Sequence, residues 1–197
     1  MRLFFAVRIA PDAIRAVTEL QKVLRKRWGD PGFRWVSADQ LHYTLQFLGE
    51  IDEVLLPEVK EAASRALPGS MRFALELSGI GGFPGHKAPR VIWVGATRGG
   101  NELGVLAARL GRELRSVGFE LEERPFKAHL TLARVKGPAA EREAARLLET
   151  QQVGPVAVSV VDAFVLMQST LSPGGSSYSV LGTFPLGSRI DPAADRA

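Results

Sequence analysis

The chain of 197 residues contains no cysteine. This absence excludes disulfides, thiolate nucleophiles and metal sites built on cysteine. No apolar run reaches the ~18 residues that a membrane-spanning helix needs. The N-terminal stretch has no small-residue cleavage site and is interrupted by Arg8 and Asp12, which is not typical of a signal peptide. We therefore expect a cytoplasmic protein that does not bind a membrane.

Basic residues slightly outnumber acidic ones, 25 against 21, which gives a net charge of +4. Six of the basic residues are lysine and the other 19 are arginine. Because the guanidinium fork matches a phosphate bidentately, this bias favours a phosphate-bearing partner. Genomic GC bias or heat adaptation explains the same composition, and the single asparagine, Asn101, fits heat adaptation.

Hydrophobic spacing divides the chain into short strands and amphipathic helices. Strands are predicted over residues 2–9, 33–36, 41–48, 72–80, 90–96, 128–135, 156–168 and 176–184, with a further short strand over 119–122. Helices are predicted over residues 11–28, 54–67, 103–117 and 138–150. Glycine and proline predict a loop over 81–89 and a hairpin turn over 172–175. The small, polar tail over 188–197 is expected to fray.

The same order of elements occurs twice, as strand, helix, strand, strand, helix, strand, with one extra strand at the end. His42 follows Arg2 by 40 positions and His129 follows Arg90 by 39, which indicates an internal duplication and a pseudo-twofold axis. Short connections between strands favour antiparallel pairing. We therefore predict an α+β fold in which residues 1–187 form a single bilobal domain. Two antiparallel sheets would face each other across a central cleft, with helices packed outside.

Two of the three histidines begin a His-x-Thr-Leu motif within a predicted strand, at His42 and at His129. With seven threonines in 197 residues, a histidine meets threonine two positions later by chance roughly 4% of the time, so two such matches are unexpected. Residues two apart in a strand point to the same face. His42 therefore shares a face with Thr44, and His129 shares one with Thr131.

A twofold axis would bring the two His-Thr pairs to one point. A free histidine titrates near pH ~6.5, so one imidazole can be neutral while the other is protonated at the same pH. Such a pair can act as general base and general acid, taking a proton from water and giving one to a leaving oxygen. Threonine hydroxyls can donate hydrogen bonds to the anionic oxygens of the reacting group. This arrangement suits in-line attack on a phosphodiester and needs neither a metal nor a covalent nucleophile.

With these motifs the sequence resembles the 2H phosphoesterase superfamily, which is defined by paired His-x-Thr motifs. It is most similar to the bacterial and archaeal RNA 2′,3′-cyclic phosphodiesterases, also called 2′-5′ RNA ligases. The similar segments are RLFFAVRIAP, RWVSADQLHYTLQFLGEI, PRVIWVGA, RPFKAHLTLARV and LMQSTLSPGGSSYSVLGTFPL. The resemblance implies a duplicated bilobal fold and metal-independent opening of a 2′,3′-cyclic phosphate to a 2′-phosphate. Ligation is then possible as the reverse reaction.

The resemblance also implies roles for individual residues. His42 would be the general acid for the leaving O3′ and His129 the general base that activates water. Thr44 and Thr131 would hold the phosphate. Arg134, five positions after His129, would bind it too, and Phe47, five positions after His42, would contact the nucleotide. Strict alternation places Arg134 and Phe47 on the opposite strand face from the histidines, so Arg134 requires a twist, bulge or strand end near Ala133.

Several alternatives remain open. The enzyme could act instead on a small cyclic nucleotide or an ADP-ribose cyclic phosphate, or the chain could be a non-catalytic module that binds RNA ends. A zinc site would need a third ligand beside the two histidines, and no HExxH motif or tight acidic cluster is present. We expect no cofactor, no metal, a monomer and an RNA partner with a 2′,3′-cyclic phosphate end. His86 is interpreted as a solvated loop residue, and core packing is the default for Trp35, Trp93 and Tyr178.

Overall fold

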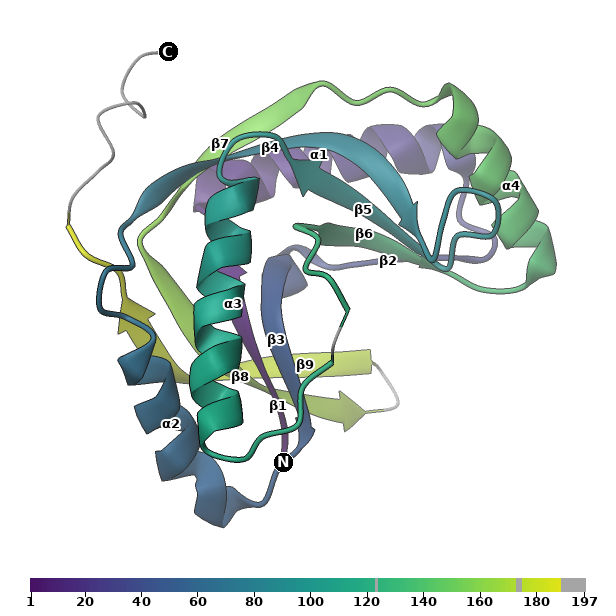
Figure 1. The fold of residues 1–197 in the computed structure, drawn as a ribbon. Coiled ribbons are helices and arrows are strands. Elements are labelled where there is room, and N and C mark those ends of the chain that lie inside the picture. The colour runs from purple at the N-terminus through teal and green to yellow at the C-terminus, as the bar shows by residue number, and fades with distance from the viewer. Residues whose placement is uncertain (123, 173–174, 189–197) are drawn as a thin grey trace.

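The computed structural model describes residues 1–122, 124–172 and 175–188 (Figure 1). Residues 189–197 of the predicted tail, and Pro173 and Gly174 of the predicted turn, lie outside the described residues. The strands are β1 (Arg2–Arg8), β2 (Phe33–Trp35), β3 (His42–Glu50), β4 (Phe73–Phe83), β5 (Val91–Ala96), β6 (Leu130–Val135), β7 (Pro155–Val161), β8 (Ala163–Ser172) and β9 (Gly175–Pro185). The helices are α1 (Pro11–Trp28), α2 (Leu56–Arg65), α3 (Gly100–Ser116) and α4 (Pro138–Thr150), with short 3-10 turns at Ala38–Gln40 and Glu53–Leu55.

The strands form one antiparallel sheet in the order β7-β4-β5-β6-β3-β1-β8-β9, and β2 pairs with β6. Four strands lie on each side of the contact between β6 and β3, which meet at a single pair of residues, Tyr43 and Leu130. The predicted α+β class and antiparallel pairing are confirmed. The two sheets that we expected are the two lobes, and this bridge joins them into one sheet.

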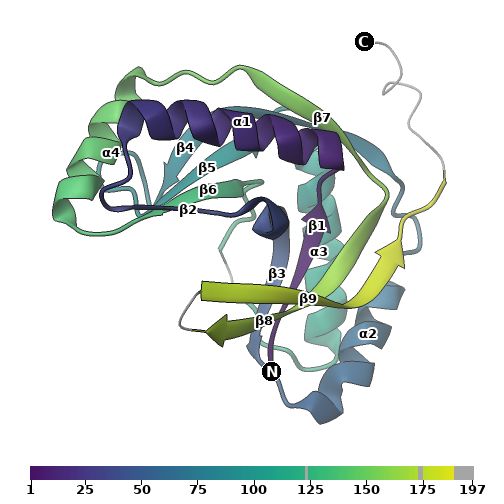
Figure 2. The ribbon, with the colours of Figure 1, turned by 180° about the vertical axis from the view of Figure 1, so that it is seen from behind.

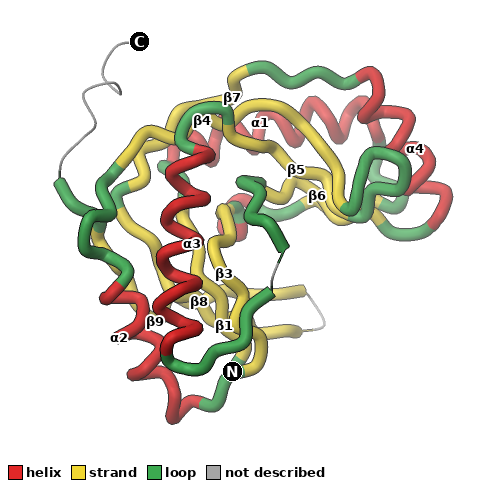
Figure 3. Tube along the Cα trace, in the orientation of Figure 1, coloured by secondary structure: helices red, strands yellow, loops and turns green. Residues whose placement is uncertain are grey.

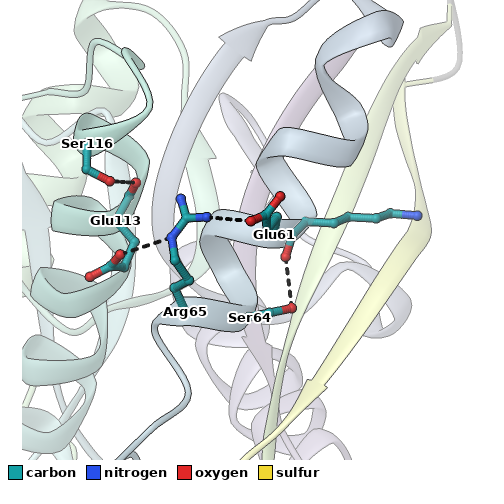
Figure 4. A network of polar contacts seen from close by, with 6 residues as sticks. Glu61, Ser64, Arg65, Glu113 and Ser116 are labelled. Atoms are coloured by element: carbon teal, nitrogen blue, oxygen red, sulfur yellow. Dashed lines mark hydrogen bonds and ion pairs between the residues drawn. The ribbon is translucent and has the colours of Figure 1, made fainter.

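Each lobe combines strands and helices from both halves of the sequence. Helix α1 follows β1 but packs on β7 in the other lobe, while α3 follows β5 and packs on β3. The ribbon shows α1 covering the lobe of β4 and β5 (Figure 2), with α3 and α2 beside the lobe of β1 and β3. Arg65 of α2 links the two helices of that lobe, because its Nη1 lies 3.1 Å from Glu61 and its Nε 3.4 Å from Glu113 of α3 (Figure 4).

The core lies between the helices and the sheet and fixes the strands that carry the motifs. Tyr43 and Leu130 are fully buried in it. The Tyr43 hydroxyl donates to the Gly95 carbonyl of β5 at 2.9 Å. Gln21 of α1 donates from Nε2 to the carbonyls of Val36 and Leu132, at 2.8 and 2.9 Å. These hydrogen bonds connect β3 to β5 and β6 to α1. Within the described part of the chain, no helix is long and apolar enough to cross a membrane.

Two predicted strands differ from the structure. The strand expected over 156–168 is broken at Asp162, because β7 pairs with β4 in one lobe while β8 pairs with β1 in the other. The strand expected over 119–122 is absent from the described residues of that segment. There the Phe119 amide donates to the Leu114 carbonyl at the end of α3, and residues 119–122 are loop (Figure 3).

The prediction of a loop over the whole of 81–89 is wrong at its start, because β4 continues to Phe83 and Gly81 pairs with Trp93. A Cβ atom at Gly81 would overlap the Trp93 indole ring. Glycine therefore serves here to let an aromatic ring lie against the strand rather than to form a loop.

Substituting Gly81→Ala is expected to lower the free energy of unfolding by about 1–3 kcal/mol, the usual cost of overpacking a core. Urea denaturation measures this change. Gly104→Ala in α3 is the matched control, because its Cβ would make an ordinary 3.6 Å contact with Phe126. The control should be neutral or slightly stabilising, since alanine favours helix more than glycine does. An unfolding midpoint for Gly81→Ala equal to that of the unsubstituted protein would contradict the packing described.

Candidate functional site

The two His-x-Thr motifs meet on one face of the sheet. Their middle residues, Tyr43 and Leu130, are antiparallel partners. Such pairing sets His42 opposite Thr131 and Thr44 opposite His129, at the distance of cross-strand neighbours. Because the middle residues point into the core, these four side chains point to the other face, where all four are half-buried. The strand predicted over 128–135 starts two residues too early, because β6 begins at Leu130, directly after His129.

Both histidine rings are held in the same way. The Nδ1 atom of His42 lies 2.7 Å from the Gln40 carbonyl oxygen, and that of His129 lies 2.7 Å from the Lys127 carbonyl oxygen. A carbonyl only accepts, so Nδ1 carries the hydrogen and donates it. In each neutral ring Nε2 is then the nitrogen that can accept a proton. Nε2 of His42 lies 3.1 Å from the Thr44 hydroxyl, which donates to it while the ring is neutral.

The surroundings lower the pKa of both imidazoles. Burial is the main cause for His42, and the positive charges of His129 and Arg134 lower its pKa further, while the bond to Gln40 opposes this. Burial also lowers the pKa of His129, where the Lys127 carbonyl opposes the shift and the Lys127 ammonium adds to it. Both rings therefore favour the neutral form in the free protein. Because the charges of His129 and Arg134 both affect the His42 pKa, the three side chains interact electrostatically.

Matching β-bulges turn Phe47 and Arg134 toward this face. In β6, Ala133 and Thr131 pair with successive residues of β5, so β6 carries one extra residue between them. In β3, Gln46 and Thr44 pair with successive residues of β1 in the same way. An extra residue reverses the alternation that follows it. The bulge required near Ala133 is thus present, and both Phe47 and Arg134 are exposed on the side of the threonines.

Aromatic rings enclose each histidine on its own lobe. The His42 ring lies 5.1 Å from Phe4 and 5.4 Å, edge to face, from Tyr178 of β9. The Phe47 ring lies 5.9 Å from Phe4 and is therefore one ring removed from His42. On the other lobe, the His129 ring lies 4.8 Å from Phe83, also edge to face. These rings contribute to the burial that is the main cause of the lowered pKa of each imidazole.

Lys127 lies above the aromatic surface of the His129 lobe. Its Nζ is 4.4 Å from the Trp93 ring centroid and 5.6 Å from that of Phe83, a cation–π arrangement. Trp93 itself is buried. The Lys127 ammonium thus lies beside His129, over the Trp93 and Phe83 rings.

Sequence reasoning missed part of this environment. The core-packing default held for Trp35, which packs with Trp28 and Phe33. Tyr178 does pack against a buried cluster that contains Phe4, but it also lies against His42, which the default did not include. The sequence pattern does not distinguish Phe4, because it lies in an unbroken apolar run of β1 whose five central residues are all buried.

Further missed residues were Phe83 and Lys127. The position of Lys127, two residues before His129, could have indicated it, whereas Phe83 was assigned to a loop. His86 is exposed in the loop after β4, as expected. In residues 1–122, 124–172 and 175–188, no three histidine, aspartate or glutamate side chains gather as metal ligands would.

Comparison with known proteins agrees with this geometry. The family described as LigT like Phosphoesterase matches the chain twice, over residues 7–93 and 94–178, which confirms the internal repeat. An RNA 2′,3′-cyclic phosphodiesterase of Thermotoga maritima is 36% identical over 181 residues, covering 92% of this chain and 93% of the relative.

Two solved structures have the same fold. A crystal structure from Thermus thermophilus has a TM-score of 0.77 at 34% identity and covers 94% of this chain and 98% of its own. Escherichia coli LigT complexed with 3′-AMP has a TM-score of 0.74 at 26% identity, covering 94% and 97% of the two chains. With two copies of the family pattern and two His-x-Thr motifs on one sheet face, the chain belongs to the LigT-like phosphoesterase family of the 2H superfamily.

Proposed function

We propose that the protein hydrolyses the 2′,3′-cyclic phosphate end of RNA to a 2′-phosphate by paired histidine catalysis. His42 acts as general acid and His129 as general base. The observation that carries the proposal is the Tyr43–Leu130 pairing, which sets the two motifs against each other on one face. The relatives named RNA 2′,3′-cyclic phosphodiesterase support phosphodiesterase activity.

The reaction uses the two Nε2 atoms, because the Nδ1 atom of each ring donates to a backbone carbonyl. Nε2 of His129 takes a proton from water, and the water oxygen bonds to phosphorus. On the opposite side the bond from phosphorus to O3′ breaks, and O3′ takes the proton from Nε2 of His42. The product carries a 2′-phosphate and a 3′-hydroxyl. His129 then holds one proton more and His42 one fewer, and exchange with solvent restores the starting state.

Charge on the phosphorane oxygens needs donors at fixed positions. Thr44 and Thr131 lie opposite the two histidines and supply hydroxyl donors. Arg134 makes no ion pair among the described residues, so its guanidinium is available to bind the phosphate bidentately. Phe47, beyond Phe4, contacts the nucleoside. These groups supply the acid, the base and the neutralising charge, so the proposed reaction proceeds without a metal ion.

The same base can activate a 5′-hydroxyl in place of water, so that the bond to O3′ breaks as before and a 2′-5′ linkage forms; this ligation is reversible. A second candidate substrate is a small nucleotide, because the E. coli relative was solved with 3′-AMP, a mononucleotide. A cyclic mononucleotide and an RNA end present the same reacting group, so substrate length distinguishes these two candidates.

The test is turnover of a short RNA that ends in a 2′,3′-cyclic phosphate, in buffer containing EDTA. Conversion to a 2′-phosphate without added metal is the expected result. Tight binding of that RNA without conversion would contradict catalysis and favour a module that binds RNA ends. Conversion of the cyclic mononucleotide alone would contradict RNA as the substrate.

The pH dependence offers a further prediction. We expect kcat/KM to be highest on the acid side of pH ~6.5, because both histidine pKa values lie below the ordinary value. Raising the pH removes the proton of the acid, His42, and lowering it protonates the base, His129. The kcat profile should lie at higher pH, since a bound anionic phosphate raises the pKa of both rings. A kcat/KM profile with both limbs above pH ~6.5 would contradict this electrostatic account.

A further inference from the structure

A cavity of about 760 Å³ lies next to His129, between β5, the first half of α3 and residues 126–128. Two of its lining residues connect it to the candidate site. Trp93 is the strand partner of Thr131, and the Lys127 carbonyl holds the His129 ring. The volume falls within the range of roughly 300–1,000 Å³ that is typical of small-molecule sites. The cavity therefore borders the candidate site through Trp93 and Lys127 and has room for a ligand of its own.

The chemistry of the lining suits a nucleotide. Phe126 supplies aromatic surface, and the Lys127 ammonium, which lies over the buried Trp93 ring, supplies one positive charge. Ser78 and Thr97 add hydroxyl groups. Aromatic surface beside a cation is the combination with which proteins bind single-stranded nucleic acid, by stacking a base and contacting its phosphate.

We propose that this cavity is the subsite for the nucleotide that precedes the cyclic-phosphate end of the RNA. The inference rests on the proposed function and adds to it a binding site for the next nucleotide of the RNA. Lys127 lies two residues before His129, about 7 Å along an extended backbone. It binds the phosphate on the 5′ side of the terminal nucleotide, while Phe126 stacks the preceding base. A cyclic mononucleotide leaves this subsite empty, so the enzyme prefers a dinucleotide.

The experiment compares two substrates, adenosine 2′,3′-cyclic phosphate and the ApA dinucleotide with the same cyclic end. The quantity measured is the ratio of kcat/KM for the dinucleotide to kcat/KM for the mononucleotide. We expect a ratio of about ten or more in the unsubstituted protein, the contribution of one stacked base. Any effect of a variant on His129 alters both substrates alike and cancels in the ratio.

The first variant, Gly104→Leu, fills the cavity. A Cβ atom at Gly104 meets only Phe126, at 3.6 Å, so the helix tolerates a side chain pointing into the space. Ser116→Leu is the matched control, because it adds the same side chain about 18 Å along the same helix, outside the cavity. A second variant, Lys127→Gln, removes the cation without filling the space. Gly104→Leu should lower the ratio to about one, and Lys127→Gln should lower it several-fold.

Each possible result either supports or overturns the proposed subsite. Loss of the ratio in Gly104→Leu and Lys127→Gln, with the ratio kept in Ser116→Leu, supports the subsite. A ratio near one in the unsubstituted protein, with both substrates converted, overturns the subsite and leaves the proposed function standing. An unchanged ratio in both cavity variants also overturns it. Failure to convert either substrate overturns the subsite and the proposed function together.

Discussion

Substituting His42→Ala or His129→Ala is expected to slow cyclic phosphate hydrolysis by roughly 10²–10⁴-fold, the usual range for loss of a general acid or base. Each substitution removes an Nε2 atom that transfers a proton in the proposed reaction. Both rings are half-buried at the surface of the sheet rather than in the core, so folding should be little changed. The double variant should lose much less than the product of the single losses, because the two groups act as one unit. Single-turnover rates and circular dichroism measure these two expectations.

The matched control is His86→Ala. His86 is the third histidine of the chain and is exposed in the loop after β4, so its loss should leave the rate unchanged. Near-normal turnover in either His42→Ala or His129→Ala would show that the paired scheme is wrong. An equally large loss in His86→Ala would place the chemistry elsewhere.

Arg134→Gln is expected to lower kcat/KM by roughly 10²–10³-fold, the range observed when one donor to a developing oxyanion is removed. The guanidinium is turned to the catalytic face by the bulge in β6, and its charge already acts on His42. Arg134→Lys should recover only part of the loss, because an ammonium keeps the charge but not the bidentate fork. The pKa of His42 should rise in Arg134→Gln, since a neighbouring positive charge is lost. NMR titration of the His42 ring measures that rise.

Arg112→Gln is the control for this prediction, because Arg112 is an exposed arginine of α3. It should leave both kcat/KM and the His42 titration unchanged. If Arg134→Gln had normal kcat/KM, the guanidinium would not contact the phosphate. If it lost activity without changing the His42 titration, the electrostatic link to His42 would be contradicted.

Local patterns were sufficient to predict the helices and the motifs. Helices over residues 11–28 and 138–150 were predicted with their observed bounds, because Pro11 and Pro138 mark where they begin. Alternation correctly placed His42 with Thr44 and buried Tyr43 between them. These features depend on residues close together in the chain, which is the information that spacing contains.

Features that depend on distant partners were not predictable in this way. The strand break at Asp162 lies within a continuous valine-rich pattern, and only the pairing of β7 and β8 with different lobes explains it. Tyr178 reaches His42 because β8 pairs with β1 and β9 with β8, an order that alternation does not encode. A twist, bulge or strand end near Ala133 was expected for Arg134, and β6 has a bulge there, whereas its counterpart in β3, which turns Phe47, was not anticipated.

In the proposed reaction His42 gives a proton to O3′ while His129 takes one from water. The most direct measurement uses a cyclic phosphate in which sulfur replaces the bridging 3′ oxygen. A thiolate leaves without protonation far more readily than an alkoxide, since an ordinary thiol pKa is about 8.5. We expect that His42→Ala recovers much of its lost rate on this substrate while His129→Ala does not. Recovery in His129→Ala alone would exchange the two roles, and recovery in neither variant would contradict acid catalysis at O3′.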